Sequence, residues 1–297
     1  MTRSAALPVT AAIPTIGRVE LVEQSLASIA ACDPPAGEIL VVDQSGDEAM
    51  AALVSRYSEA GARLVSTSRR SRSHARNLAL QEAANDLVAF TDDDCTVEPN
   101  WIGAAWGHAG KRPHTAVTGR VLPVGDPAAV PSTIDAPEPR DYTGMRPPAA
   151  LFGNNMVFDR STAMEMGGFD HAVIPAEDND FSYRWLKAGY EIRYEPELTV
   201  HHHDWRDREG LERLYVEYAR GQGKFYAKHL RGGDTTMVWF IVRHFYLGVR
   251  GLAVGIVKGR PRWSDERRGI FAGFPGGLVA GWRASPEPLG DDDGAPD

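Results

Sequence analysis

Three consecutive aspartates, Asp92, Asp93 and Asp94, follow the apolar segment 87–90 and Thr91. Adjacent carboxylates repel one another, so a protein that places them at the end of a buried strand needs a cation there. Oxygen ligands favour Mg²⁺ or Mn²⁺, which commonly keep coordination positions for the phosphates of a nucleotide. A solvated acidic turn is the alternative interpretation, and the neighbouring motifs must decide between the two.

A basic segment at the start of a helix is the second candidate for ligand binding. It contains Arg69, Arg70, Arg72 and Arg76, and the helix continues to Ala84. Unpaired backbone N–H groups and the helix dipole favour anions at a helix start, so the segment predicts a diphosphate site. Arg69 and Arg70 fit a solvated basic face better, whereas Arg76 lies inside the first turns, where its position is fixed.

A second acidic group, Glu177 and Asp178, begins a helix that runs to Lys187. Residues two apart on a helix point to nearly opposite sides, so Asp178 and Asp180 cannot both face one site. We expect Asp180 to form an ordinary helical ion pair with Arg184, worth about 0.3–0.5 kcal/mol. Asp178 and Glu177 then remain free to face a cleft.

Three consecutive histidines, His201, His202 and His203, end an extended segment that begins at Tyr194. Successive side chains on a strand alternate between its two faces, so at most two of the histidines face the same way. Either a metal ligand or a solvated histidine cluster fits this pattern.

The elements that must position these residues alternate between strands and helices. This order predicts an α/β fold with a parallel, doubly wound sheet, in which ligands bind beyond the carboxyl ends of the strands. Asp43, which ends the second strand, is therefore expected on the same rim as the three aspartates. The strands are expected at 8–14, 38–43, 63–65, 86–90, 115–124 and 151–158, with helices ending at 31, spanning 47–60 and beginning at 99. Seven prolines in 123–148 predict a long loop, typical of a lid or binding segment.

Composition limits the class of protein. The chain has 297 residues, of which 43% are hydrophobic, enough for one large domain with or without appendages. A formal charge of −8 argues against nucleic acid as the main partner. Two distant cysteines give neither a disulfide framework nor a paired-cysteine zinc signature, and we see no leader sequence, which together indicate a cytoplasmic protein.

The order of motifs over about residues 9–203 resembles the family 2 glycosyltransferases with the GT-A fold. No single motif is specific, but eight in the same order are. They are Ile13-Pro14-Thr15 with Arg18, Val41-Val42-Asp43 with Ser45 and Asp47, 73–80, Thr91 to Asp94, Gly153-Asn154, 167–170, Glu177-Asp178 through Arg184, and Pro196 followed by histidine.

The resemblance implies roles for these residues. Pro14, Thr15 and Asp43 would hold the nucleotide base, Arg76 the base or diphosphate, and Asp92 or Asp93 the ribose. Metal binding would fall to Asp94 and His202, with Mn²⁺ or Mg²⁺ as cofactor. On the acceptor side it implies Gly153, Asn154 and Glu177, with Asp178 as the general base. Two residues depart from the family's pattern: Gln44 leaves the base identity open, and Cys95 is expected to serve in packing.

The implied function is metal-dependent, inverting transfer of a sugar from a UDP-, GDP- or dTDP-linked donor to a glycan, lipid-linked or small-molecule acceptor. Such reactions serve cell-surface polysaccharide, glycolipid or glycosylated-metabolite synthesis. Two alternatives remain: a sugar-phosphate nucleotidyltransferase, which normally needs a glycine-rich loop after the first strand that 13–17 does not supply, and a non-catalytic sugar-nucleotide-binding or membrane-scaffold protein.

Helices dominate the C-terminal third. We expect a catalytic domain at 1–203, divided into a nucleotide-binding half at about 8–95 and an acceptor half at 96–203, then a helical region at 204–284 and a disordered acidic tail at 285–297. The helices are expected at 204–229, 236–258 and 264–283. Aromatic and basic residues interleave over 236–283, which suits contact with the inner face of a membrane, while closure of the cleft or a homodimer fits the same apolar face.

Overall fold

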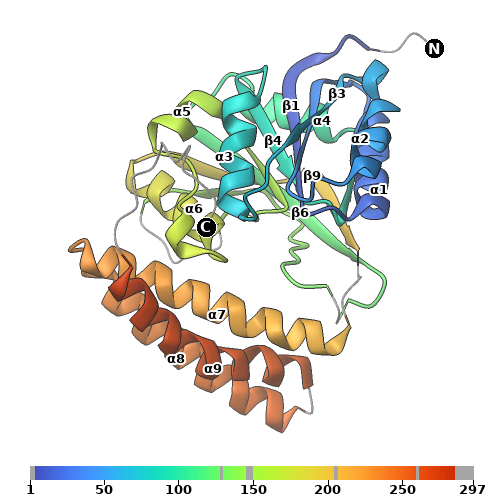
Figure 1. Cartoon of the computed structure of the whole chain (residues 1–297). Helices are drawn as coiled ribbons and strands as arrows, with labels where there is room; N and C mark the ends of the chain where they lie inside the picture. The colour runs from blue at the N-terminus through green and yellow to red at the C-terminus, as the bar shows by residue number, and fades with distance from the viewer. Residues whose placement is uncertain (1–3, 128–129, 145–149, 204–206, 259–260, 285–297) are drawn as a thin grey trace. The chain divides into compact units, whose positions relative to one another are not determined.

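The computed structural model describes residues 4–127, 130–144, 150–203, 207–258 and 261–284 (Figure 1). The chain divides into two compact units. The first comprises Met1–Phe169 and Phe181–Trp205, and the second comprises Asp170–Asp180 and Arg206–Asp297. The second unit thus includes a short segment from the middle of the region that we expected to form the catalytic domain. The acidic tail lies outside the described residues.

The first unit has the α/β architecture that the sequence predicts. Its strands are β1 (Leu7–Thr15), β2 (Ala36–Asp43), β3 (Ala62–Ser66), β4 (Leu87–Thr91), β5 (Cys95–Val97), β6 (Thr115–Val124), β7 (Arg140–Tyr142), β8 (Asn155–Asp159) and β9 (Glu191–His203). Its helices are α1 (Val19–Ala30), α2 (Glu48–Ser55), α3 (Arg72–Glu82), α4 (Trp101–Ala109) and α5 (Arg160–Glu165), with short 3-10 turns at Ser58–Ala60 and, in the second unit, His171–Val173. Helix α6 (Glu177–Lys187) begins in the second unit and continues into the first.

One mixed sheet carries all nine strands in the order β3-β2-β1-β4-β8-β6-β9-β5, with β7 paired to β9. Strands β3, β2, β1 and β4 run parallel. Thr15 is paired with Asp43 at the ends of β1 and β2, and β4 ends beside them at Thr91. The carboxyl ends of these strands therefore place Asp43 and the three aspartates on one rim.

Alternation along the strands creates a hydrophobic core on each face of the sheet. In β1, Val9, Ala11 and Ile13 join one core with α1, α2 and α4, whereas Ala12 joins the other with α3, α5 and the second half of α6. These helices are seen on both sides of the sheet in Figure 1. Both faces of the central strands are thus covered, as their continuous apolar sequences require.

Three expectations for local structure were wrong. The expected helix over 47–60 is α2 followed by a separate 3-10 turn, because residues 56 and 57 do not continue the helix. The expected strand at 151–158 begins only at Asn155, because the preceding residues form a turn in which Asn155 donates to Phe152 O at 2.8 Å. The proline-rich region includes the strand β7 and a bridge between Val121 and Ile134, while residues 128–129 and 145–149 lie outside the described residues.

The buried carboxylate of Glu38 on β2 connects β1, β3 and the end of α3. Glu38, only 6% exposed, accepts hydrogen bonds from Thr10 Oγ1 at 2.6 Å, Arg63 Nε at 2.6 Å and the backbone N–H of Ala84 at 2.8 Å. Burial by itself raises the pKa of Glu38, but these hydrogen bonds and the charge of Arg63 lower it below the usual 4.5. The ionised form therefore stabilises the folded state.

We expect Glu38→Gln to lower the free energy of unfolding by about 2 kcal/mol at neutral pH, because a charge-assisted buried network loses its anion. Since the folded pKa lies below the unfolded value, this contribution is full above about pH 4.5 and is lost as the pH falls through the folded pKa. Urea unfolding at neutral pH and at about pH 3 checks this. The exposed pair of Glu23 with Arg56 gives a control, Glu23→Gln, that should change stability by less than about 0.5 kcal/mol at either pH.

The second unit contains three long helices, α7 (Arg208–Arg231), α8 (Thr236–Val257) and α9 (Pro261–Arg283). Glycines at four-residue spacing allow α9 to pack closely on α7. A Cβ at Gly277 would lie 2.0 Å from Arg220 O, and one at Gly273 would lie 2.1 Å from Val216 O. Only glycine fits such a backbone-to-backbone contact, which is typical of helices that associate through small residues.

Candidate functional site

The three aspartates of the acidic motif have different surroundings. Asp93 is 1% exposed, and its carboxylate accepts hydrogen bonds from Thr15 Oγ1 at 2.6 Å and Arg18 Nε at 3.0 Å, with a second, shorter contact from Arg18. Burial raises the pKa of Asp93 to about 6, although Arg18 and Thr15 stabilise the carboxylate. Both Asp93 oxygens are occupied within the protein, so this residue holds the rim together.

Arg18 supplies one positive charge to the acidic motif, and sequence reasoning missed this role. Gly17 directs it there: the glycine has φ of +98°, and a Cβ on it would lie 2.5 Å from Ser45 Cβ. Arg18 Nη1 also lies 3.5 Å from Asp94 Oδ2. The sequence did contain a signal for this role: Arg18 comes shortly after the first strand, so it is expected near the same rim as the acidic motif.

Asp92 is the accessible member of the motif, with 36% of its side chain exposed. Its Oδ1 lies 3.4 Å from Arg76 Nη2, and the same nitrogen donates to Gly153 O at 3.2 Å. The Arg76 guanidinium lies 5.5 Å from the centroid of the Phe169 ring and is 4% exposed as a residue. The structure thus brings Arg76, Asp92 and Gly153 together, with Arg76 in a buried and fixed position.

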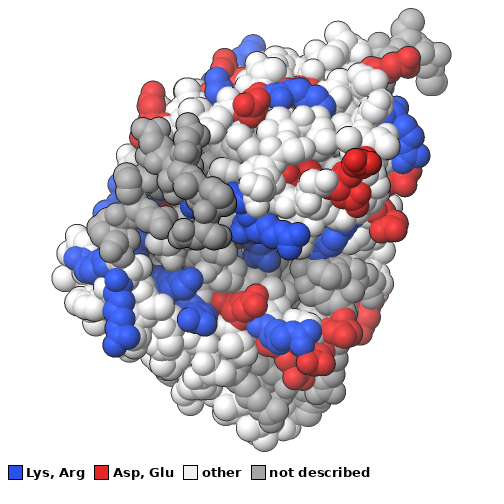
Figure 2. All heavy atoms as spheres, viewed as in Figure 1, with Lys and Arg blue, Asp and Glu red and all other residues white. Residues whose placement is uncertain are grey.

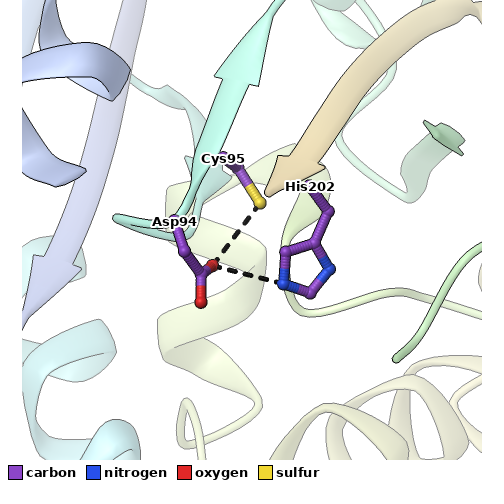
Figure 3. A group of neighbouring side chains, drawn as sticks. All are labelled: Asp94, Cys95 and His202. Carbon is purple, nitrogen blue, oxygen red and sulfur yellow. Dashed lines mark hydrogen bonds and ion pairs between the residues drawn. The ribbon is translucent and has the colours of Figure 1, made fainter. Parts of the chain in front are cut away.

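Asp94 lies in a different cluster, with Cys95 and His202 (Figure 3). Asp94 Oδ1 is 3.7 Å from Cys95 Sγ and 3.4 Å from His202 Nε2, and all three ligand atoms lie within 4.8 Å of one another. Cys95 and His202 are directly paired across β5 and β9, so their side chains lie on the same face of the sheet. Each of the three residues is less than 5% exposed.

The alternation along β9 separates the three histidines. His201 Nε2 lies 2.6 Å from Glu98 Oε1, and His203 Nε2 lies 2.9 Å from Thr96 Oγ1. His202 alone of the three is paired in register with Cys95 and lies beside Asp94. The sequence left open which histidine meets the acidic motif, and the structure brings His202 to it.

The donor atoms of this cluster fit a divalent cation. His202 Nε2 is buried and makes no hydrogen bond, even though Asp94 Oδ1 is near. The contact with Asp94 is an ion pair only if the ring is protonated, and a buried ring nitrogen that makes no hydrogen bond is well placed to coordinate a metal ion. The other ring nitrogen, Nδ1, lies 3.4 Å from the amide of Asn154, which is 3% exposed and so can fix the ring's orientation. Asp94 and His202 are therefore suited to hold a metal ion with Asn154 behind the histidine.

Asp43 and its neighbours form the third part of the rim. Asp43 is 1% exposed and accepts from the backbone N–H groups of Ser45 and Gly46 at 3.0 Å, and from Ser45 Oγ at 2.8 Å. Gln44 connects this rim to α3, because its Nε2 donates to Thr15 O and its Oε1 accepts from the N–H of Ser71. Pro14 is half-buried within β1 beside Val42.

The expected acceptor-side carboxylates lie in the second unit, at the start of α6. Glu177 is 2% exposed, whereas Asp178 is partly exposed and accepts from the N–H of Asn179 at 2.8 Å. The second half of the same helix is held in the first unit's core by Phe181 and Trp185. The structure thus gives Asp178 a fixed place at the beginning of a helix that is well anchored further along.

Asp180 has partners that the expected helical ion pair did not include. It is fully buried and lies 2.8 Å from both Lys228 Nζ and His229 Nε2 of α7. Arg184 donates to the carbonyl oxygens of Met166 and Gly168. Spacing within one helix could not reveal this, because the partners of Asp180 lie about fifty residues further along the chain.

Comparison with known proteins addresses the family and the fold of the chain. The family model for glycosyl transferase family 2 matches residues 10–163, more than half of the chain. The "Pre-mycofactocin glycosyltransferase" of Mycobacterium tuberculosis is 30% identical over 153 residues, which cover 47% of this chain and 32% of that protein. The "O-antigen chain rhamnosyltransferase WbaN" of Salmonella anatum is 26% identical over 193 residues, 60% of each chain. The chain therefore matches less than two thirds of either relative's length.

Solved structures share the fold. The mannosyltransferase PcManGT from Pyrobaculum calidifontis, in complex with GDP-Man and Mn²⁺, matches 93% of this chain and 88% of its own with a TM-score of 0.65 and 19% identity. S. aureus TarS 1-349, in complex with UDP-GlcNAc, matches 88% of this chain and 79% of its own with a TM-score of 0.61 and 17% identity. The architecture is the GT-A fold with additional C-terminal helices, and the chain belongs to glycosyl transferase family 2.

Proposed function

We propose that this chain is a metal-dependent, inverting glycosyltransferase that moves a sugar from a nucleotide-diphospho-sugar to an acceptor hydroxyl. The observation that carries the proposal is the buried cluster of Asp94 and His202, whose Nε2 has no hydrogen bond. It lies at the carboxyl end of the parallel strands, where ligands bind in open α/β sheets. The GDP-Man and UDP-GlcNAc complexes of PcManGT and TarS support a donor of this class.

The donor side follows from the rim. Asp43 and the segment Pro14–Thr15 would contact the nucleotide base, and the exposed carboxylate of Asp92 would accept from the ribose hydroxyls. Arg76, which is buried beside Asp92, would present a fixed positive charge to the base or the diphosphate. Asp93 would position Thr15 and Arg18 through its two hydrogen-bonded oxygens.

The reaction itself is a direct displacement. Asp178 would accept the proton of the acceptor hydroxyl, whose oxygen forms a bond to the anomeric carbon as the bond from that carbon to the diphosphate oxygen breaks. Configuration at the carbon inverts, and the nucleoside diphosphate leaves with the bonding electrons. A divalent cation held by Asp94 and His202 would supply positive charge to the leaving diphosphate. Glu177 would position the base, with Gly153 and Asn154 between donor and acceptor.

Donor binding tests the proposal without knowledge of the acceptor. A ligand at about 100 times its dissociation constant stabilises the folded state by about 2.7 kcal/mol. We therefore expect a rise in melting temperature with one class among UDP-, GDP- and dTDP-sugars in the presence of Mn²⁺ or Mg²⁺, and a smaller rise without metal. No shift with any of these donors would contradict the proposal. Mass spectrometry of products with glycan, lipid-linked and small-molecule acceptors then identifies the acceptor.

The second unit carries an exposed apolar face on α8, which we propose as a contact with an anionic membrane surface. Within the described residues, α8 is the helix long and apolar enough to cross a membrane, with a mean hydropathy of 1.5, but core helices of soluble proteins pass the same test. Its exposed large side chains, each more than half exposed, are Val238, Trp239, Val242, Tyr246, Val249, Ile256 and Val257. Arg243 lies 5.9 Å from the Trp239 ring on the same face, which suits anionic lipid head groups.

In Figure 2 the described atoms at the lower edge of the view, where Figure 1 draws α8, are mostly white, so Lys, Arg, Asp and Glu are sparse there. Arg243 and Arg250 are exposed among these apolar residues of α8, so basic and apolar side chains form one surface.

We expect the protein to cosediment with vesicles that contain anionic lipid, with a blue shift of tryptophan fluorescence. Val242→Glu should lower vesicle affinity about tenfold or more, because it places a negative charge in the apolar face. Met164→Glu on α5 is the matched control, since Met164 is an exposed apolar residue of the first unit. The alternative outcome is that the protein does not bind vesicles but has the mass of a dimer in solution, and that Val242→Glu abolishes the dimer. That result would show that the face forms a homodimer interface instead.

A further inference from the structure

We propose that Cys95 is a third protein ligand of the metal site, and that its thiolate gives the site a preference for Co²⁺, Zn²⁺ and Cd²⁺ over Mn²⁺ and Mg²⁺. This inference rests on the proposed function, because it extends the metal site of Asp94 and His202. It also revises the sequence-based expectation that Cys95 serves only in packing.

The first support is the placement of the three donor atoms. Cys95 and His202 are a direct cross-strand pair of β5 and β9, and Asp94 immediately precedes Cys95 (Figure 3). Tetrahedral sites with bonds of about 2.0–2.3 Å place neighbouring ligand atoms about 3.3–3.8 Å apart. The observed separations, 3.4 Å from Asp94 Oδ1 to His202 Nε2 and 3.7 Å from Asp94 Oδ1 to Cys95 Sγ, fall in that range.

The second support is independent of the cysteine. His202 Nε2 is buried without a hydrogen bond and faces Asp94 Oδ1, the atom that Cys95 Sγ also contacts. The Asn154 amide beside Nδ1 can rotate so that its oxygen accepts from an Nδ1–H group, which leaves Nε2 a lone pair for a cation. In the present orientation Asn154 Oδ1 is itself buried without a partner, so the rotation costs no hydrogen bond from that oxygen.

The third support is charge. Binding of a divalent ion would form a metal–sulfur bond and break the S–H bond, with the proton released to solvent. Asp94 and a Cys95 thiolate would then bring two negative charges to the two positive charges of the ion, while Arg18, whose Nη1 lies 3.5 Å from Asp94 Oδ2, is itself paired with Asp93. A mixed sulfur, nitrogen and oxygen set favours the later first-row ions, whereas oxygen sets suit Mg²⁺ and Mn²⁺.

Cobalt titration of single-cysteine proteins tests the inference. The chain has two cysteines, so Cys32→Ala leaves Cys95 as the one thiol. We expect wild type and Cys32→Ala to develop a near-ultraviolet thiolate-to-cobalt absorption band with Co²⁺. Cys95→Ser should lack this band and bind Co²⁺ and Zn²⁺ about 10–100-fold more weakly, with Mn²⁺ affinity changed by less than about threefold. If Cys95→Ser fails to fold, the spectrum of Cys32→Ala decides by itself.

The outcomes separate this inference from the proposed function. Visible cobalt bands in Cys32→Ala without a thiolate band would overturn the role of Cys95 and leave the metal site of Asp94 and His202 in place. Equal Co²⁺ affinity of wild type and Cys95→Ser would do the same. Absence of binding by Co²⁺ and Mn²⁺ alike, with and without a nucleoside diphosphate, would overturn both this inference and metal dependence.

Discussion

Asp94→Asn is expected to lower kcat/KM for sugar transfer by at least about 10³-fold while the melting temperature of the free protein changes little. Asparagine has nearly the same shape as aspartate but carries no charge, so we expect it to hold a divalent ion with His202 far more weakly. The departing diphosphate would then lose the positive charge that a bound metal ion supplies. Steady-state kinetics with saturating Mn²⁺, together with Mn²⁺ binding by calorimetry, checks both parts of the expectation.

Asp92→Asn is the matched control for this prediction. It removes an equal charge two positions earlier in the same motif, but Asp92 is partly exposed and faces Arg76 rather than His202. We expect it to raise the KM for the donor by about tenfold and to leave Mn²⁺ affinity nearly unchanged. Sugar transfer by Asp94→Asn at the wild-type rate, or an equal loss of Mn²⁺ binding in both variants, would contradict the assignment of the metal to Asp94.

The rim itself could be predicted from the sequence, because it needs only local information. Asp43 and the acidic motif each follow an apolar strand, and parallel strands bring such ends together. The different surroundings of the three aspartates could be seen only in the structure. The carboxylate of Asp93 is occupied by hydrogen bonds from Thr15 and Arg18. The turn at Gly17 places Arg18 beside Asp93.

The histidine and the buried aspartate depended on partners distant in the chain. Alternation along β9 predicted that His202 differs from its neighbours, but its face is set by β5, a three-residue strand too short to show a sequence pattern. Asp180 looked like a surface residue because Arg184 stands at helical spacing. Its cationic partners, Lys228 and His229, come from α7, so no local rule could have found its burial.

Asp178→Asn is expected to lower kcat by at least about 10³-fold with little change in the KM for the donor, because the amide cannot accept the acceptor's proton. Donor binding, measured by the Mn²⁺-dependent thermal shift, should persist, since the metal and donor groups lie on the rim of the first unit. Rapid-quench transfer assays with excess enzyme separate the chemical step from product release. The melting temperature should be close to that of wild type, because Asp178 is partly exposed.

Asp180→Asn makes the comparison decisive, since it is the same substitution two residues further along the same helix. Asp180 is fully buried beside Lys228 and His229, and Asp180→Asn removes its charge-assisted hydrogen bonds at a cost of about 1.5–3 kcal/mol, while Lys228 keeps its ion pair with Asp170. We therefore expect Asp180→Asn to lower the melting temperature strongly and Asp178→Asn to lower only the rate. If instead Asp178→Asn transfers sugar at the wild-type rate, the general base is another group, and the partly exposed start of α6 has no part in the chemistry.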